Sequence, residues 1–176
     1  MQRFQKALLF FILLNTVNYA FSPAVKEKIN WISFEELQQQ YEKNPKPIII
    51  DLYTNWCGWC KEMDRTTYKH DKLATYINEH YYAVKYNAES KDSVFFNKIK
   101  YSFNKRVETN DLAMYLTFGR LEYPTTVFLA SPDARPAPLS GYMKPKEMEA
   151  PLKYFVERTN FQETFIEFNK RMKKEW

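Results

Sequence analysis

Two cysteines with the spacing of a redox pair are the residues of this sequence best suited to chemistry. Cys57 and Cys60 are the only cysteines among the 176 residues, and both lie in the pentapeptide WCGWC. An apolar run at 47–53 precedes them and an amphipathic stretch at 61–76 follows, which predicts a strand, a short loop and a helix. Cys57 would then lie at the helix N-terminus, where unpaired N–H groups and the helix dipole favour a thiolate. Cys60 follows one turn later on the same side, so the two sulfurs could close a disulfide or open to a dithiol.

Other roles for the two cysteines fit the sequence less well. A structural zinc ion needs four ligands, and beside this one pair the chain offers only His70 and His80. Both histidines lie near predicted helix ends, and we interpret them as structural. A purely structural disulfide over so short a loop would remove little chain entropy from the unfolded state. The spacing therefore favours a redox-active pair, and no metal site is predicted.

An acidic residue interrupts the apolar run that precedes the cysteines. The run over 48–53 is apolar on both faces, as expected of a central strand covered by helices, and Asp51 is its exception. Either this carboxylate lies at an exposed edge, or burial raises its pKa. A buried carboxyl that exchanges a proton near neutral pH would assist Cys60, because the second thiol must be deprotonated for disulfide exchange.

Strands and helices are predicted to alternate around these residues. Ser33 and Glu36 form a capping box that opens the first helix. The predicted elements up to residue 87 are a strand at 29–32, a helix from Ser33 to about Lys43, the strand at 48–53, a helix that breaks near His70-Asp71 and continues over 73–80, and a strand at 81–87.

Residues 88–109 interrupt this alternation. Asn97-Lys98 separates two short runs rich in strand-forming residues, which favours a β-hairpin over 94–103, with a helix as the alternative. An apolar stripe on the final helix predicts that it packs on the domain. The later predicted elements are a helix at 111–118 capped by Thr109 or Asn110, a strand at 122–129, a turn at 131–138, an edge strand at 139–143, a helix at 146–158 and a final helix at 161–173.

The first twenty residues have the pattern of an export signal. Arg3 and Lys6 supply positive charge, residues 7–14 form an apolar core, and Ala20 is a small residue at a plausible cleavage site. The apolar run is short for a permanent membrane span, and an uncleaved anchor is the alternative. We therefore predict a signal peptide at 1–20 and one domain at 21–176.

Composition and charge indicate a folded domain and argue against nucleic acid as a partner. The chain has 13 Tyr and 14 Phe against 3 Gly, which indicates an ordered and well-packed domain. The net charge of +5 is spread over clusters of mixed sign, without a basic block interleaved with aromatic residues. We therefore expect no nucleic-acid partner.

Several separate features resemble the thioredoxin family. They are the WCGWC motif, Asp51 six residues before Cys57, Lys85 in the following strand, Tyr123-Pro124 in the place of the family's cis-proline loop and Gly141 in the last strand. The chain is similar to exported thioredoxin-like proteins over about residues 29–158. This resemblance implies an α/β thioredoxin-like fold with a central mixed sheet flanked by helices, to which this chain adds a hairpin insertion at about 88–109 and a C-terminal helix at about 161–173.

The resemblance also implies a mechanism of thiol–disulfide exchange. Cys57, exposed at the helix N-terminus, would attack a substrate disulfide, and the more buried Cys60 would resolve the mixed disulfide. Asp51 would take the proton from Cys60, and Lys85 would lie near that acid. No cofactor beyond the Cys57–Cys60 disulfide is implied.

Substrate contacts are expected from two segments. Pro124 would hold a cis peptide bond and leave the backbone of Tyr123 open to pair with an extended substrate segment. Trp56 and Trp59 would form a flat apolar rim for that segment, although ordinary packing explains either tryptophan equally well, and Gly58 is a further substrate-binding residue. Trp59 replaces the proline common between thioredoxin cysteines, so redox potential and substrate choice cannot be carried over from the family.

The direction of the reaction remains open at this point. The resemblance favours a reductase of disulfides in exported, periplasmic proteins, supplied with electrons by a membrane thiol reductant and acting as a monomer. An isomerase or an oxidase is the alternative among enzymes, because reduction potential decides the direction. A non-catalytic substrate-binding or chaperone-like module is the alternative from another class.

Overall fold

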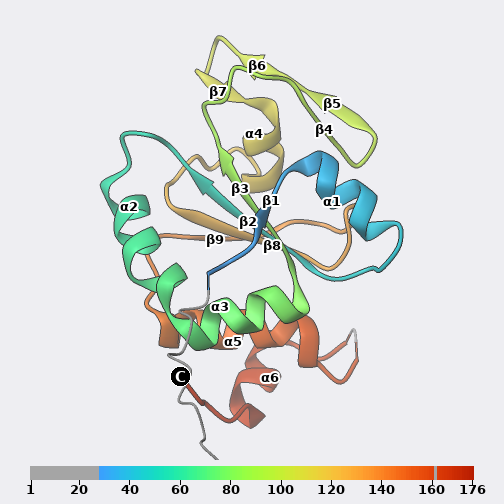
Figure 1. Ribbon diagram of the computed structural model, residues 1–176, viewed down its shortest axis with the longest axis vertical. Coiled ribbons are helices and arrows are strands. Elements are labelled where there is room, and N and C mark those ends of the chain that lie inside the picture. The colour runs from blue at the N-terminus through green and yellow to red at the C-terminus, as the bar shows by residue number, and fades with distance from the viewer. Residues whose placement is uncertain (1–27, 161) are drawn as a thin grey trace, which may run out of the picture.

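A five-stranded mixed sheet organises the computed structural model, which describes residues 28–160 and 162–176 (Figure 1). The strand order is β1-β3-β2-β8-β9. These strands are β1 (Trp31–Ile32), β2 (Ile48–Tyr53), β3 (Tyr82–Asn87), β8 (Thr125–Leu129) and β9 (Ala137–Ser140). The central strand β2 pairs in parallel with β3 and antiparallel with β8. The mixed α/β thioredoxin-like fold predicted from the sequence is confirmed.

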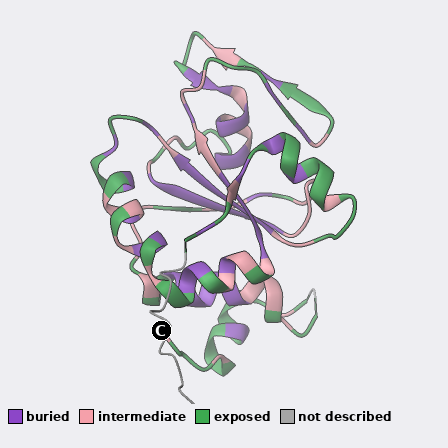
Figure 2. Cartoon of the chain, viewed as in Figure 1, coloured by how far each residue is buried: buried purple, intermediate pink, exposed green. Residues whose placement is uncertain are grey.

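Helices cover both faces of this sheet. One apolar cluster joins the sheet to α1 and α4, and a second joins it to α2, α3 and α5. Figure 2 shows the buried residues concentrated in the sheet and on the helix sides that face it. The helices are α1 (Phe34–Tyr41), α2 (Gly58–Arg65), the 3-10 helix η1 (Thr67–Lys69), α3 (Asp71–His80), α4 (Asp111–Thr117), α5 (Pro145–Glu157) and α6 (Phe165–Arg171).

The predicted hairpin is present, and a second small ribbon follows it. Asn97 and Lys98 both have positive φ, of 48° and 63°, as a tight two-residue hairpin turn requires. The predicted second strand ends early, because the chain leaves the first ribbon at Ser102 and pairs again as β6 with β7. The four strands are β4 (Val94–Phe96), β5 (Ile99–Tyr101), β6 (Phe103–Asn104) and β7 (Thr109–Asn110). The Phe96 ring lies 5.4 Å from the Phe34 ring, so the insertion packs on α1.

Two late elements differ from their predicted bounds. The edge strand occupies 137–140 rather than 139–143, because Gly141 turns out of the sheet with φ +101° and donates its N–H to the Pro124 carbonyl at 2.7 Å. The final helix spans Phe165–Arg171 rather than 161–173, because Thr164 forms its N-cap. Phe168 is fully buried, as predicted for a helix that packs on the domain.

Two predictions fall outside the described residues. These are the signal peptide at 1–20 and the placement of Phe161 at the start of the final helix. Within 28–160 and 162–176, none of the helices combines the length and the apolar character needed to cross a membrane.

Candidate active site at the Cys57–Cys60 disulfide

The cysteine pair lies where the loop after β2 turns into α2. The Cys57 N–H donates to the Thr54 carbonyl at 3.2 Å, which turns the chain, and Cys57 becomes the N-cap of α2. Its Sγ accepts the Cys60 N–H at 3.0 Å, so a sulfur occupies the capping position that a serine or aspartate oxygen usually takes. Cys57 and Cys60 form a disulfide with Cα atoms 5.3 Å apart. The site is therefore captured in its oxidised form.

The expected difference in exposure between the two cysteines is absent. Cys57 and Cys60 are each only 4% exposed, so the prediction of an exposed Cys57 beside a more buried Cys60 is wrong for this form. The disulfide holds both sulfurs together at the N-terminus of α2, so the two cysteines are equally buried. Their chemical difference therefore comes from position in the helix, since only Cys57 is the N-cap.

Asp51 is buried, and its environment favours the protonated form. It is 2% exposed at the centre of β2, which decides between the two predicted placements in favour of the interior. Burial raises its pKa from the ordinary 3.8 to about 6, although the Lys85 ammonium opposes this rise. Lys85 lies opposite Asp51 in the β2–β3 pairing, and its Nζ is 3.3 Å from Oδ2. The prediction that Lys85 lies near the acid is thus confirmed.

Sequence reasoning missed two residues around this carboxyl. The Tyr68 hydroxyl donates to Asp51 Oδ1 at 3.2 Å and lies 3.3 Å from Thr126 Oγ1. Asp64 of α2 forms an ion pair with Lys85, and its negative charge contributes to the raised pKa of Asp51. Asp64 follows Cys60 by four residues, so helical spacing could have placed it on the side of the buried acid.

The proline loop has the predicted cis geometry. The Tyr123–Pro124 peptide bond is cis, and Gly141 bonds the Pro124 carbonyl from the neighbouring chain segment. Among the described residues, no backbone hydrogen bond uses the N–H or C=O of Tyr123. The backbone of Tyr123 is therefore available to an extended peptide.

Both tryptophans of the motif are exposed, so neither belongs to the core. Trp56 is 68% exposed, and its Nε1–H donates to Glu89 Oε1 at 2.8 Å while its ring meets Tyr123 edge-on at 6.0 Å. Trp59 is 63% exposed and packs against the Tyr142 ring at 5.4 Å. The two exposed rings of the motif are therefore held in place by different partners, Trp56 by Glu89 and Tyr123 and Trp59 by Tyr142.

Gly58 does not require glycine for reasons of fold. A Cβ added there would meet no atom within 4 Å, and the backbone has no positive φ. Any role of Gly58 in substrate binding would come from the space that it leaves beside Cys57.

No metal-binding cluster accompanies the disulfide. Over the described ranges, no three His, Cys, Asp or Glu side chains are grouped so that they could hold a metal ion. His70 precedes α3 as its N-cap residue and His80 ends that helix, as the sequence suggested.

Comparison with known proteins identifies the family. The thioredoxin-like domain family matches residues 34–156, and the chain belongs to this family. The match spans α1 to α5 and therefore includes the cysteine pair, the buried acid, the insertion and the cis-proline loop.

Similar proteins agree with this assignment. A thiol:disulfide interchange protein DsbD of Campylobacter jejuni is 32% identical over 63 residues, which are 34% of this chain and 11% of that protein. The structure of a thioredoxin-fold protein from Helicobacter pylori aligns with a TM-score of 0.55 at 18% identity, over 72% of this chain and 80% of that one. A thioredoxin from Thermus thermophilus aligns with a TM-score of 0.54 at 12% identity, over 76% and 89%. These two structures share the fold.

Fold, family and disulfide together define the class of protein. It is a member of the thioredoxin-like domain family with a thioredoxin fold, and its C-x-x-C pair forms a disulfide at a helix N-terminus. The chain spans about a tenth of the length of the Campylobacter jejuni relative, so that protein's full activity does not transfer with the match.

Proposed function

We propose that the chain reduces disulfide bonds in exported proteins through Cys57 and Cys60. The observation that carries this proposal is the Cys57–Cys60 disulfide at the N-terminus of α2. The buried Asp51 of the preceding strand, whose pKa burial raises to about 6, suits a group that exchanges protons near neutral pH. The Campylobacter jejuni relative, which is by name a thiol:disulfide interchange protein, supports exchange chemistry. Asp51 lies in β2, the strand that leads into the motif, and this location supports its use in that chemistry.

The reaction proceeds in two exchange steps. The Cys57 thiolate attacks one sulfur of a substrate disulfide, breaks that bond, forms a mixed disulfide and releases the first substrate thiolate. The Cys60 thiolate then attacks the Cys57 sulfur and releases the second substrate thiolate. Two electrons pass to the substrate, and the protein ends as the Cys57–Cys60 disulfide, the form described above.

Asp51 acts on the second step by accepting the proton of the Cys60 thiol. Ile49 and Asp51 point to the same face of β2, and Ile49 packs in one cluster with Met63 of α2. Cys60 precedes Met63 by three residues and is likewise buried, so it lies on the side of α2 that faces this surface. Lys85, shared between Asp51 and Asp64, stabilises the carboxylate form of Asp51, which is the form that accepts this proton.

Substrate binds across the surface beside the disulfide. The free backbone groups of Tyr123 pair with an extended substrate segment, as an added strand would. The exposed rings of Trp56 and Trp59 contact the substrate, and the open space beside Gly58 admits the substrate sulfur.

Partners and location follow from this chemistry. The substrates are disulfide-containing exported proteins, and the protein works in the periplasm after export through residues 1–20 or while anchored there. Each turnover leaves the protein oxidised, so a membrane thiol reductant must return two electrons to the disulfide. The protein acts as a monomer, without a nucleic-acid partner and without a cofactor beyond its own disulfide.

Trapping separates catalysis from simple binding. Cys57→Ser should abolish reduction of insulin disulfides, whereas Cys60→Ser should accumulate mixed disulfides with substrates, because the resolving thiol is missing. Non-reducing gels followed by mass spectrometry would measure both. If Cys60→Ser traps nothing while partner binding survives Cys57→Ser, the protein is a binding module and not an enzyme.

The reduction potential tests the direction. We expect a midpoint near that of thioredoxin, about −270 mV, because Asp51 disfavours the thiolate of the dithiol form. Equilibration of the purified domain with glutathione buffers, followed by counting of free thiols, gives the value. A midpoint above about −180 mV would replace the reductase by an isomerase or an oxidase.

A further inference from the structure

An open hollow bordered by two aromatic rings lies beside the disulfide. Gly58, Trp59 and Glu62 of α2 line it together with Tyr142, which follows the edge strand β9. The Trp59 ring meets the Tyr142 ring at 5.4 Å, with an angle of 38° between the two planes. Because only Gly58 separates Cys57 from Trp59 in the chain, the hollow begins next to the cysteine that attacks the substrate.

The charged and hydroxyl groups around this hollow are already paired with each other. The Glu62 carboxylate accepts two hydrogen bonds from the Arg65 guanidinium, at 2.7 and 3.0 Å. The Tyr142 hydroxyl lies 3.1 Å from Thr66 Oγ1, which donates to the backbone carbonyl of Glu62 at 2.8 Å. These bonds hold the Tyr142 ring beside α2. The hollow therefore offers a ligand the surfaces of two rings and no unpaired charge.

The hollow also adjoins the backbone with which a substrate would pair. The Gly141 N–H donates to the Pro124 carbonyl at 2.7 Å, so Tyr142 comes directly after the point where its segment touches the cis-proline loop. A substrate segment that pairs with the backbone of Tyr123 and brings its cysteine to Cys57 runs beside the hollow. A side chain next to the substrate cysteine can therefore enter it, as side chains of an added strand enter pockets beside the strand.

We propose that the hollow between Trp59 and Tyr142 selects substrates with an aromatic side chain next to the reactive cysteine. This specificity rests on the proposed function, because it selects among the disulfides that Cys57 attacks. A substrate ring placed against the two rings removes apolar surface from water and gains the tilted or edge-on contacts that aromatic rings favour. Cysteines with aromatic neighbours are mostly buried in folded proteins. The preferred substrates are therefore exported proteins whose disulfides are exposed because folding is incomplete or incorrect.

Other side chains fit the hollow less well. A cationic side chain could face the two rings, but Arg65 already occupies the Glu62 carboxylate and would repel a second cation. An anionic side chain would meet the negative faces of the rings. A small polar side chain would leave the rings of Trp59 and Tyr142 in water.

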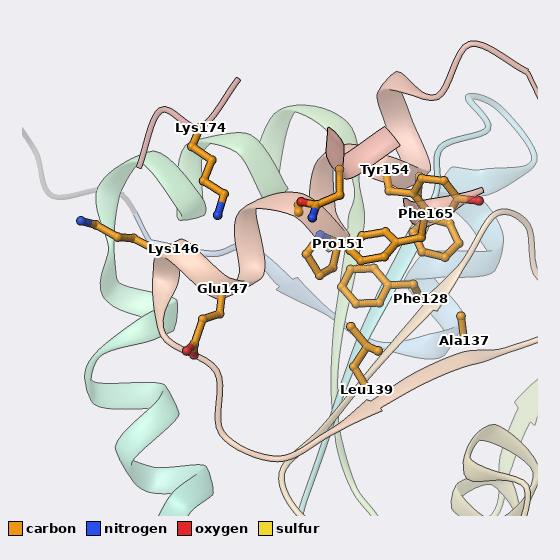
Figure 3. Close-up of a pocket in the computed structure, with 12 residues that line it drawn as sticks. Phe128, Ala137, Leu139, Lys146, Glu147, Pro151, Tyr154, Phe165 and Lys174 are labelled. Carbon is orange, nitrogen blue, oxygen red and sulfur yellow. The ribbon is translucent and has the colours of Figure 1, made fainter. Parts of the chain in front are cut away.

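A larger groove elsewhere supplies the control. It lies between α5, α6 and β9, and none of the residues that line it belongs to the site around the disulfide (Figure 3). Phe165 of this groove is 42% exposed, and its ring meets the Tyr154 ring at 5.6 Å. Phe165→Ala therefore removes an exposed ring that packs against a tyrosine, as Trp59→Ala does, but away from the cysteines.

Disulfide exchange with a matched set of peptides tests the proposal. Each peptide carries one cysteine between two copies of the same residue, which is Phe, Ser, Lys or Glu, and is supplied as its disulfide-linked dimer. In Cys60→Ser, the Cys57 thiolate attacks this disulfide, forms a mixed disulfide and releases one peptide thiolate. The equilibrium constant of this exchange, measured by mass spectrometry, should be about tenfold higher or more for the Phe peptide than for the other three, since the ring is partly buried.

Further substitutions in Cys60→Ser assign the preference to the two rings. Trp59→Ala, at a residue 63% exposed, and Tyr142→Ser should each bring the ratio of the Phe to the Ser peptide to within about threefold of unity. Tyr142→Phe keeps the ring and should keep the preference, and so should the control Phe165→Ala. The proposal is overturned if Cys60→Ser shows no preference for the Phe peptide, if Trp59→Ala or Tyr142→Ser retains the full preference, or if Phe165→Ala loses it as well.

Turnover by the parent chain separates this specificity from the proposed function. The parent chain, reduced beforehand, should reduce the Phe peptide dimer faster than the Ser dimer. A parent chain that reduces neither peptide, while Cys60→Ser still prefers Phe, would overturn the reductase and leave the specificity of the hollow in place. Reduction of all four peptides at one rate would overturn the specificity and leave the reductase in place.

Discussion

The two faces of strand β2 bury different chemistry. Ile48, Ile50 and Leu52 point to the face covered by α1 and α4, and all three are fully buried among apolar side chains. Ile49 and Asp51 point to the face covered by α2, α3 and α5. One face of the same strand therefore carries only apolar packing, whereas the other carries a carboxyl group.

The difference teaches how the fold combines stability with reactivity. Apolar burial stabilises the domain by roughly 25 cal/mol per Å² removed from water. Burial of the Asp51 carboxylate acts in the opposite direction, and only part of the cost is offset by Lys85 and Tyr68. Asp51 therefore weakens the fold at neutral pH, but the same burial raises its pKa to about 6, which suits a group that exchanges protons.

The largest expected effect is on the apolar face. Ile50→Ala should lower the free energy of unfolding by about 2–5 kcal/mol, because Ile50 is fully buried and a cavity would replace its side chain. The molecules that remain folded should reduce disulfides at the parent rate, since Ile50 lies on the face away from Asp51. Urea denaturation and an insulin reduction assay measure the two quantities. A loss of stability below about 1 kcal/mol would show that this face does not hold the domain together.

The next largest effect concerns the polar face of β2, the face that carries Asp51, and here a substitution should raise the stability instead of lowering it. Between pH 4 and 6 the folded protein holds the Asp51 proton more tightly than the unfolded chain does, because the pKa rises from 3.8 to about 6. Stability of the parent chain therefore falls as pH rises through this window. Asp51→Asn does not titrate and so lacks this loss of stability. Compared with the parent chain, it should be more stable by up to about 3 kcal/mol at pH 7 and about equally stable at pH 4.

The same variant should lose function while it gains stability. Without the carboxylate the second exchange step lacks its proton acceptor, so turnover at pH 7 should slow and its rise with pH near 6 should disappear. Urea denaturation at pH 4 and pH 7 and a pH–rate profile of insulin reduction measure both effects. An unchanged pH dependence of the rate would remove Asp51 from the mechanism.

Local sequence patterns predicted much of this arrangement. The capping box at Ser33, the strand over 48–53 and the turn at Asn97-Lys98 depend on residues within a few positions of each other, and all three are present. The helix N-terminus at Cys57 follows from the same kind of local signal. Such features can be read from sequence because their causes lie within one turn or one strand.

Features that depend on distant contacts escaped prediction. Tyr68 bonds Asp51 across 17 positions, and the bond from Gly141 to Pro124 that ends β9 also joins segments apart in sequence. The burial of Cys57 depends on the closed disulfide and its surroundings, which no local pattern describes. The contacts on the polar face of β2 thus depend on tertiary packing, whereas the apolar face could be predicted from the local sequence pattern.

The smallest expected effect concerns the hydroxyl that Tyr68 places against Asp51. Tyr68→Phe removes a bond of 3.2 Å to Oδ1 and the contact with Thr126, which should cost about 1 kcal/mol of stability. The bond lowers the pKa of Asp51, so its loss should raise that pKa further above about 6 and move the rise in the pH–rate profile to higher pH. The matched control is Tyr76→Phe, which loses a bond of 2.8 Å to Glu157 away from the site and should leave the profile in place. An equal shift in both variants, or none in Tyr68→Phe, would mean that the hydroxyl supports packing alone and that Lys85 and burial set the proton affinity of the polar face.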